Sequence, residues 1–286
     1  MFFKKISLPL LLVPFLWINP FLIKRGFAII PFYSIPYGSE LEKESLSIGK
    51  SAYQLLYFGQ IKEALNLAEL AISINQKNEN LWVILAEAQM ANNLTKEALE
   101  SLNEGKKINP MMSELYFAES SIFLSQKNNS KAKKAILKGI EINPKNTTAI
   151  FQLGNIYLME ENYNIAIKSF NEAIKLKQDF WQAINNIGLA YFELDNIQSS
   201  IKYFEKAIEI ETNAEPMLGL AASIQKNNRK KAIELTKKAL LKNPKYVSNT
   251  FREEQLWGKK IQKATNQLLN FQELEEDIIF ARQYLN

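Results

Sequence analysis

The chain has 286 residues, of which 47% are apolar, and it carries a formal net charge of +5 without any cysteine or histidine. The absence of these two residue types excludes a Cys/His zinc site, a thiol nucleophile, a Ser-His-Asp triad and a disulfide framework. The positive charge is spread along the chain rather than gathered among aromatic residues, so the sequence predicts no nucleic-acid partner.

The first predicted element is an apolar N-terminal segment. Two lysines precede an apolar run over residues 6–23, and Lys24 and Arg25 follow it. A basic start before an apolar run is typical of a secretory signal peptide, and the run is also just long enough to anchor a chain in a bilayer. We therefore expect residues 1–28 to be a signal peptide or a membrane anchor, followed by a linker and helix lead-in over 29–44. The protein is then exported or membrane-anchored, in a periplasm, lumen or membrane, and not freely cytoplasmic.

A period of 34 residues begins after this segment. The Asn-Pro pairs at 109–110 and 143–144 are 34 residues apart, and aligning the chain on them gives five units with no insertion. Small residues then recur at the eighth position of the units, as Ala52, Ala86, Ser120, Gly154 and Gly188. They recur at the twentieth position as Ala64, Ala98, Ala132, Ala166 and Ser200. Because a small side chain lets two helix axes approach to ~8–10 Å, this spacing predicts two antiparallel helices per unit.

Six units are expected in all. The regular units occupy residues 45–78, 79–112, 113–146, 147–180 and 181–214, and a degenerate sixth occupies 213–244. In the sixth unit Leu220 stands where a small residue is expected. After Pro244 the period ends, and Thr250 begins a capping-box sequence that is followed by an amphipathic stretch. A terminal repeat needs a cover with a polar outer face, so residues 245–286 are predicted to form C-terminal capping helices.

The repeated positions resemble the tetratricopeptide repeat. The residues that carry the resemblance are Trp82, Leu85, Ala86, Ala98 and Pro110 in the second unit and Leu153, Gly154, Tyr157, Ala166, Phe170 and Ala173 in the fourth. The resemblance covers residues 45–244 and implies an all-α fold, a right-handed α-solenoid of stacked helix-turn-helix repeats. The sequence at 251–258 is also similar to the tail of tetratricopeptide proteins from cyanobacteria and plastids.

The resemblance also implies a binding groove, because in this family the first helix of each unit lines a concave face. The positions carried over to this chain give a protein-binding groove of Phe117, Ser121, Thr148, Phe151, Asn155, Leu158, Met159, Gln182, Asn185, Leu189 and Phe192. An apolar strip with amides suits an extended or helical peptide. The alternative is that Phe117, Phe151 and Phe192 are buried between units, as aromatic residues on helices usually are.

A non-catalytic scaffold is the function that these features favour. The tetratricopeptide subclass that grips chaperone tails would need lysine at the fifth position of the first units, where Gly49, Val83 and Phe117 stand. There is no glycine-rich phosphate loop, and the sequence predicts no catalytic, cofactor-binding or metal-binding residues. We expect a protein or peptide partner in the groove and membrane contact through the N-terminal segment. A role in assembling a membrane complex follows from the resemblance alone, and the alternative is a permanent structural subunit of a multiprotein complex.

Overall fold

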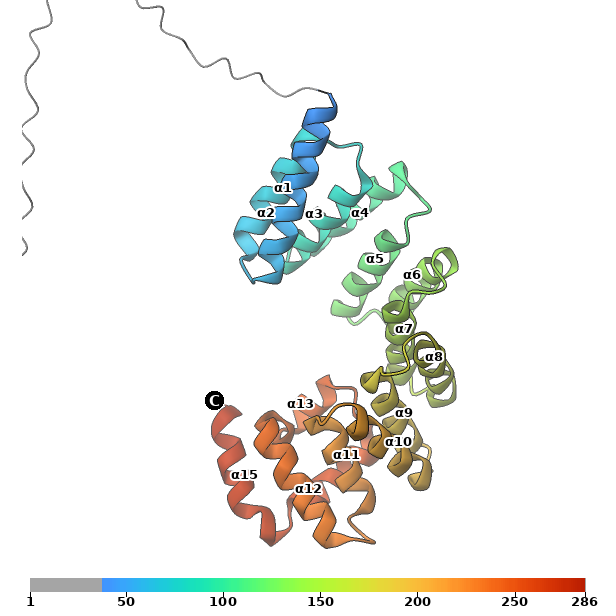
Figure 1. Cartoon of the computed structure of the whole chain (residues 1–286), viewed down its shortest axis with the longest axis vertical. Coiled ribbons are helices and arrows are strands. Elements are labelled where there is room, and N and C mark those ends of the chain that lie inside the picture. The colour runs from blue at the N-terminus through green and yellow to red at the C-terminus, as the bar shows by residue number, and fades with distance from the viewer. Residues whose placement is uncertain (1–37, 286) are drawn as a thin grey trace, which may run out of the picture. The chain divides into compact units, whose positions relative to one another are not determined.

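Helices make up the part of the chain that the structure describes, residues 38–285 of a computed structural model (Figure 1). These residues form fifteen α-helices and three short 3-10 helices, and no strand is found among them. None of the helices in this range is both long enough and apolar enough to span a bilayer. The segment over 1–28 lies outside the described residues, so its role as signal peptide or anchor stays a prediction.

Six pairs of antiparallel helices follow one another in chain order. They are α1 (Ser39–Tyr57) with α2 (Ile61–Ile74), α3 (Glu79–Ala91) with α4 (Thr95–Ile108), α5 (Ser113–Ser125) with α6 (Asn129–Ile142), α7 (Thr147–Met159) with α8 (Tyr163–Leu176), α9 (Trp181–Glu193) with α10 (Ile197–Ile210), and α11 (Ala214–Ile224) with α12 (Arg229–Lys242). The second helix of each pair contacts the first helix of the next. This arrangement confirms the predicted all-α solenoid.

Close packing at the small residues explains why the helices pair as they do. The helix bounds recur every 34 residues from α3 to α10. Glycines at the eighth position leave space that an aromatic ring of the paired helix fills. A Cβ on Gly154 would lie 2.5 Å from the ring of Phe170, and one on Gly188 would lie 2.8 Å from the ring of Phe204. Real Cβ atoms do not approach that closely, so these positions require glycine to keep the two helices together.

The sixth pair departs from the register that the sequence analysis gave it. Helix α11 begins at Ala214, which is 33 residues after the start of α9 at Trp181, whereas α3, α5, α7 and α9 begin at intervals of 34. Counting from Ala214 puts the fully buried Ala221, not Leu220, at the eighth position. The expectation of a large residue at this contact was therefore wrong, because the sixth unit was counted from residue 213, one residue before α11 begins.

The chain after residue 243 forms η1 (Pro244–Val247), α13 (Asn249–Glu254), α14 (Lys259–Leu269), η2 (Gln272–Leu274), α15 (Glu275–Arg282) and η3 (Gln283–Leu285). Helix α15 packs on α12 and η1 at the end of the stack (Figure 1). Helix α14 packs instead on α9 and α11. The predicted capping box is corrected as well, since Ser248 rather than Thr250 is the N-cap residue, and its side chain accepts a hydrogen bond from the Phe251 N–H at 3.3 Å.

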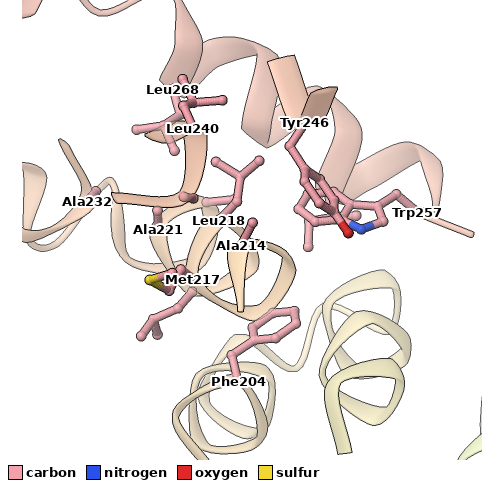
Figure 2. Packing of buried hydrophobic residues seen from close by; sticks show 14 of the residues in the cluster. Phe204, Ala214, Met217, Leu218, Ala221, Ala232, Leu240, Tyr246, Trp257 and Leu268 are labelled. Atoms are coloured by element: carbon pink, nitrogen blue, oxygen red, sulfur yellow. The ribbon is translucent and has the colours of Figure 1, made fainter. Parts of the chain in front are cut away.

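The largest core of the described residues joins the sixth pair to this C-terminal segment. Figure 2 shows Phe204 of α10, Leu218 of α11 and Leu240 of α12 converging with Trp257 and Leu268 from the C-terminal segment. Every residue of α11 is buried, because α9, α10, α12 and α14 surround it. The C-terminal segment is therefore an integral part of the last two repeats.

Candidate protein-binding groove

The first helices of the pairs form one inner layer, which is the surface where the sequence analysis placed the groove. Contacts run from α1 to α3 and on to α5, and from α7 to α9 and on to α11. At the C-terminal end, α14 lies on this layer against α9 and α11. The described chain therefore supplies its own helix to one section of the inner layer.

Glu193 at the end of α9 fixes the beginning of α14. Its carboxylate accepts hydrogen bonds from the backbone N–H groups of Lys260 at 3.2 Å and Ile261 at 2.9 Å. These are the second and third residues of α14, and the N-cap Gly258 has no side chain to satisfy them. Glu193 of the fifth pair therefore caps the N-terminus of α14, with its negative charge at the positive end of the helix dipole. Lys260 completes the contact by donating from Nζ to the carbonyl oxygen of Glu193 at 2.6 Å.

Buried polar contacts hold the rest of the segment to α11. The indole N–H of Trp257 donates to the Glu215 carboxylate at 3.1 Å, and the Gln225 side chain donates to the Ala264 carbonyl oxygen at 2.8 Å. Buried polar groups that are hydrogen-bonded in this way specify one arrangement of the surrounding elements. The position of α14 is thus set by directional contacts in addition to apolar packing.

This arrangement determines the exposure of the groove residues predicted in the fifth unit. Asn185, Leu189 and Phe192 are 0%, 1% and 7% exposed, and Gln182 is half-buried. The sequence predicts an open binding surface at these positions, and for Asn185, Leu189 and Phe192 that expectation is wrong. The reason is that the fold-back of the C-terminal segment covers the inner layer at α9.

Two residues predicted in the fourth unit pack against neighbouring side chains. The Phe151 ring is half-buried and packs between those of Phe170 and Phe180 of its own unit, with centroid distances of 5.6 and 4.8 Å. The Asn155 side chain accepts a hydrogen bond from the Asn186 amide at 2.9 Å, and this contact connects the fourth unit to the fifth.

An open section of the inner layer lies at α1, α3, α5 and α7, and we call it the N-terminal groove. It encloses about 440 Å³. The predicted residues Phe117, Ser121 and Thr148 line it. Its other lining residues include Tyr53, Asn80, Val83, Ile84, Glu87, Met112, Glu114, Ala118 and Gln152.

Residues of the second unit also line the N-terminal groove, although none of them was predicted to do so. Val83 and Glu87 stand 34 residues before Phe117 and Ser121, so the same repeat positions that gave the third unit could have given the second. Tyr53 of α1 is more than half exposed and completes this wall. The 34-residue period is therefore the sequence signal that predicts these groove residues.

A second cavity, of about 640 Å³, lies beside α14. The predicted residues Leu158, Met159 and Leu189 form part of its wall, opposite Leu256 and Gln262 of the C-terminal segment. These three side chains therefore face the inner layer as the sequence analysis expected, although a segment of the same chain lies across from them.

Comparison with known families identifies the repeat. A model described as TPR repeat matches residues 154–195, and two models described as tetratricopeptide repeat match residues 55–117 and residues 113–146 with 182–213. The chain is a tetratricopeptide-repeat protein. Proteins of this kind are generally non-catalytic scaffolds.

Solved structures share the fold of this tetratricopeptide-repeat protein. The crystal structure of a MamA protein has 24% identity and a TM-score of 0.51, covering 61% of this chain and 94% of its own. A thermophilic TPR protein from Thermus thermophilus has 19% identity and a TM-score of 0.51, with 64% and 98% covered. MamA from Desulfovibrio magneticus has 17% identity and a TM-score of 0.52, with 60% and 96% covered. Comparison of the sequence with curated proteins found no significant match.

The N-terminal groove of this tetratricopeptide-repeat protein is acidic, although the chain as a whole is basic. Glu87 and Glu114 line it, and no lysine or arginine does. Glu87 is half-buried and forms no ion pair within residues 38–285, and burial raises the pKa of its carboxyl group. The groove thus presents a carboxylate that has lost part of its hydration without gaining a cationic partner.

The buried carboxyl of Glu215 makes the stability of this region depend on pH. Burial raises the pKa of Glu215 to about 6, and the hydrogen bond from Trp257 opposes that shift. The folded chain then holds a proton that the unfolded chain has released, so the contribution of Glu215 to stability falls as the pH rises from about 4.5 through about 6.

We therefore expect Glu215→Gln to raise the free energy of unfolding by about 2 kcal/mol at pH 7.5 and to change it little at pH 4.5. The amide keeps an oxygen for the indole N–H of Trp257 but has no charge to bury. Urea denaturation at both pH values measures the difference, and Glu211→Gln at an exposed position is the matched control. A gain that is the same at both pH values would contradict this account.

Proposed function

We propose that this tetratricopeptide-repeat protein is a non-catalytic scaffold that binds a segment of a partner protein in the N-terminal groove. The observation that carries the proposal is the position of α14. This helix packs on the inner layer at α9 and α11, where a bound helix from a partner would pack. The same layer at α1, α3, α5 and α7 is lined as a groove and has no helix of the described chain upon it.

The lining of the N-terminal groove supports this proposal. Val83, Ile84 and Phe117 are apolar residues of this lining, while Ser121 and Thr148 are polar residues that can form hydrogen bonds. A groove of this composition suits a peptide that inserts apolar side chains and pairs its polar groups at the edges. Interfaces of this kind derive most of their affinity from a few apolar anchors in the centre.

Arginine placed in the lining of the N-terminal groove tests the proposal. Ser121→Arg should lower the amount of partner captured by the full chain by tenfold or more, about 1.4 kcal/mol, because a long charged side chain fills the groove. Folding should be unaffected, since Ser121 is exposed. Capture is measured on immobilised protein and read by mass spectrometry, alongside the melting temperature.

The matched control is Ser130→Arg, which places the same side chain at an exposed position of α6, outside the groove lining. The control should retain every partner that the parent captures. Partners that survive Ser121→Arg, or that are lost equally from both variants, would show that binding occurs elsewhere on the protein.

Two narrower proposals concern the setting of this scaffold. The first is that the partner belongs to a membrane complex, which rests on the apolar run over 6–23 and on the family resemblance. The second is that the protein is of the cyanobacterial or plastid kind, which rests on the resemblance of 251–258, residues that the family models do not match. Those eight residues include Trp257, which anchors the C-terminal segment to α11.

A further inference from the structure

We infer that the segment bound in the N-terminal groove is an amphipathic helix with lysine or arginine beside its apolar stripe. This inference rests on the proposed function, because it names the chemistry of the partner for the same groove. Two independent features carry it, namely the helix that the inner layer already holds and the charge of the open section.

Helix α14 shows what the inner layer accepts. Its buried face includes Ile261, Thr265 and Leu268, spaced as i, i+4 and i+7, which is one stripe of a helix. On the receiving side, Leu189 of α9 belongs to the core that contains Ile261 and Leu268. A stripe of this spacing, with Ile261 and Leu268 as its apolar members, therefore packs against the first helices of the repeats.

The open section repeats the receiving surface. Ser121 and Glu87 stand 68 and 102 residues before Leu189, which is two and three periods of 34, so they hold the same position in their units. Val83 and Phe117 hold the fifth position and supply apolar contacts. Because the period brings equivalent positions to the same face, a helix that fits one section has a corresponding seat in the other.

The charge of the open section selects the kind of helix. Glu87 in the groove lining has no ion pair within the described residues, and Glu114 adds a second carboxylate to that lining. A lysine or arginine that reaches Glu87 would form a charge-assisted hydrogen bond in partly dehydrated surroundings, where such a bond is strong.

The experiment uses the full chain and three synthetic peptides labelled with fluorescein. The first contains leucine at helical i, i+3, i+4 and i+7 spacing with lysine at the other positions. The second replaces every lysine with glutamate, and the third keeps the composition of the first but distributes the leucines around the helix. Fluorescence anisotropy at physiological salt gives each Kd.

We expect the first peptide to bind at least tenfold more tightly than either of the others. Glu87→Gln should weaken the binding of the first peptide about three- to tenfold without lowering the melting temperature, since the amide has the same shape as the carboxylate. Glu100→Gln, at an exposed position of α4 outside the groove lining, is the matched control and should bind like the parent.

The outcomes separate this inference from the proposed function. Equal binding of the first and third peptides, or of the first and second, would overturn the inference. So would a failure of the first peptide to bind while Ser121→Arg still abolishes capture of the natural partner, and in that case the scaffold function would stand. If Ser121→Arg and Glu87→Gln both retained every natural partner, the proposed function itself would be wrong.

Discussion

Replacing Phe204 with alanine should lower the free energy of unfolding by about 3–5 kcal/mol, the range for removing a large aromatic side chain from a close-packed core. The Phe204 ring is fully buried and fills the space left by two glycines. A Cβ on Gly188 would lie 2.8 Å from it, and one on Gly219 would lie 2.6 Å from it. One ring thus joins α10 to both α9 and α11, and its removal leaves a cavity where the fifth and sixth units meet.

Urea denaturation followed by circular dichroism measures this loss, and hydrogen exchange shows where it falls. Protection should decrease most in α9, α10 and α11, because a repeat array transmits a defect mainly to its neighbours. Phe58→Ala is the matched control. Its side chain is 73% exposed at the turn after α1, so the change should stay within about 0.5 kcal/mol. Equal effects of the two variants would contradict the packing described for Phe204.

Arg252→Ala should destabilise the C-terminal segment by about 3 kcal/mol, because hydrogen bonds from a charged donor contribute more than neutral ones. The Arg252 side chain is fully buried and donates to the Tyr246 carbonyl oxygen at 2.6 Å, to Asn249 at 3.1 Å and to Asn266. These acceptors belong to η1, α13 and α14. Burial lowers the pKa of Arg252 to about 10, so the group still carries its charge at neutral pH.

The expected result is local release of α14 from the inner layer, seen as new proteolytic cleavage near residues 249–270 before the rest of the chain unfolds. Arg252→Lys should restore little of the stability, since an ammonium group cannot reproduce the planar fork that reaches three acceptors. Arg282→Ala on the exposed side of α15 is the control and should be cleaved like the parent. A segment that stays protected in Arg252→Ala would show that apolar packing alone holds it.

The repeat was predictable from sequence because its determinants are local. A small residue such as Ala166 marks a helix contact within its own unit, and the 34-residue spacing carries that contact from unit to unit. The register of the sixth pair was not predictable in the same way. Starting the sixth unit at Ala214 instead of residue 213 moves the contact from Leu220 to Ala221, and both residues lie within an apolar helix.

The covered part of the groove could not be read from the sequence. The stripe of Ile261, Thr265 and Leu268 fits any apolar surface of suitable width, and nothing in that spacing says whether the helix covers the end of the stack or its inner layer. The decisive contact is the one between Glu193 and the start of α14, which joins residues far apart in the chain. Asn185 and Leu189 were placed on the right face but could not be recognised as covered.

The link between Glu193 and α14 has a consequence for how the chain matures on the ribosome. The carboxylate of Glu193 is made 68 residues before the backbone N–H of Ile261 that it binds. Each earlier hairpin can complete its packing when the next one emerges, since it needs only its neighbours. The inner faces of α9 and α11 must wait for the nascent chain to reach α14, so they stay exposed to solvent after all six helix pairs have been made. A polypeptide cut short before Lys259 would display a longer stretch of open groove than the finished protein, and it would be prone to capture other helices in place of its own.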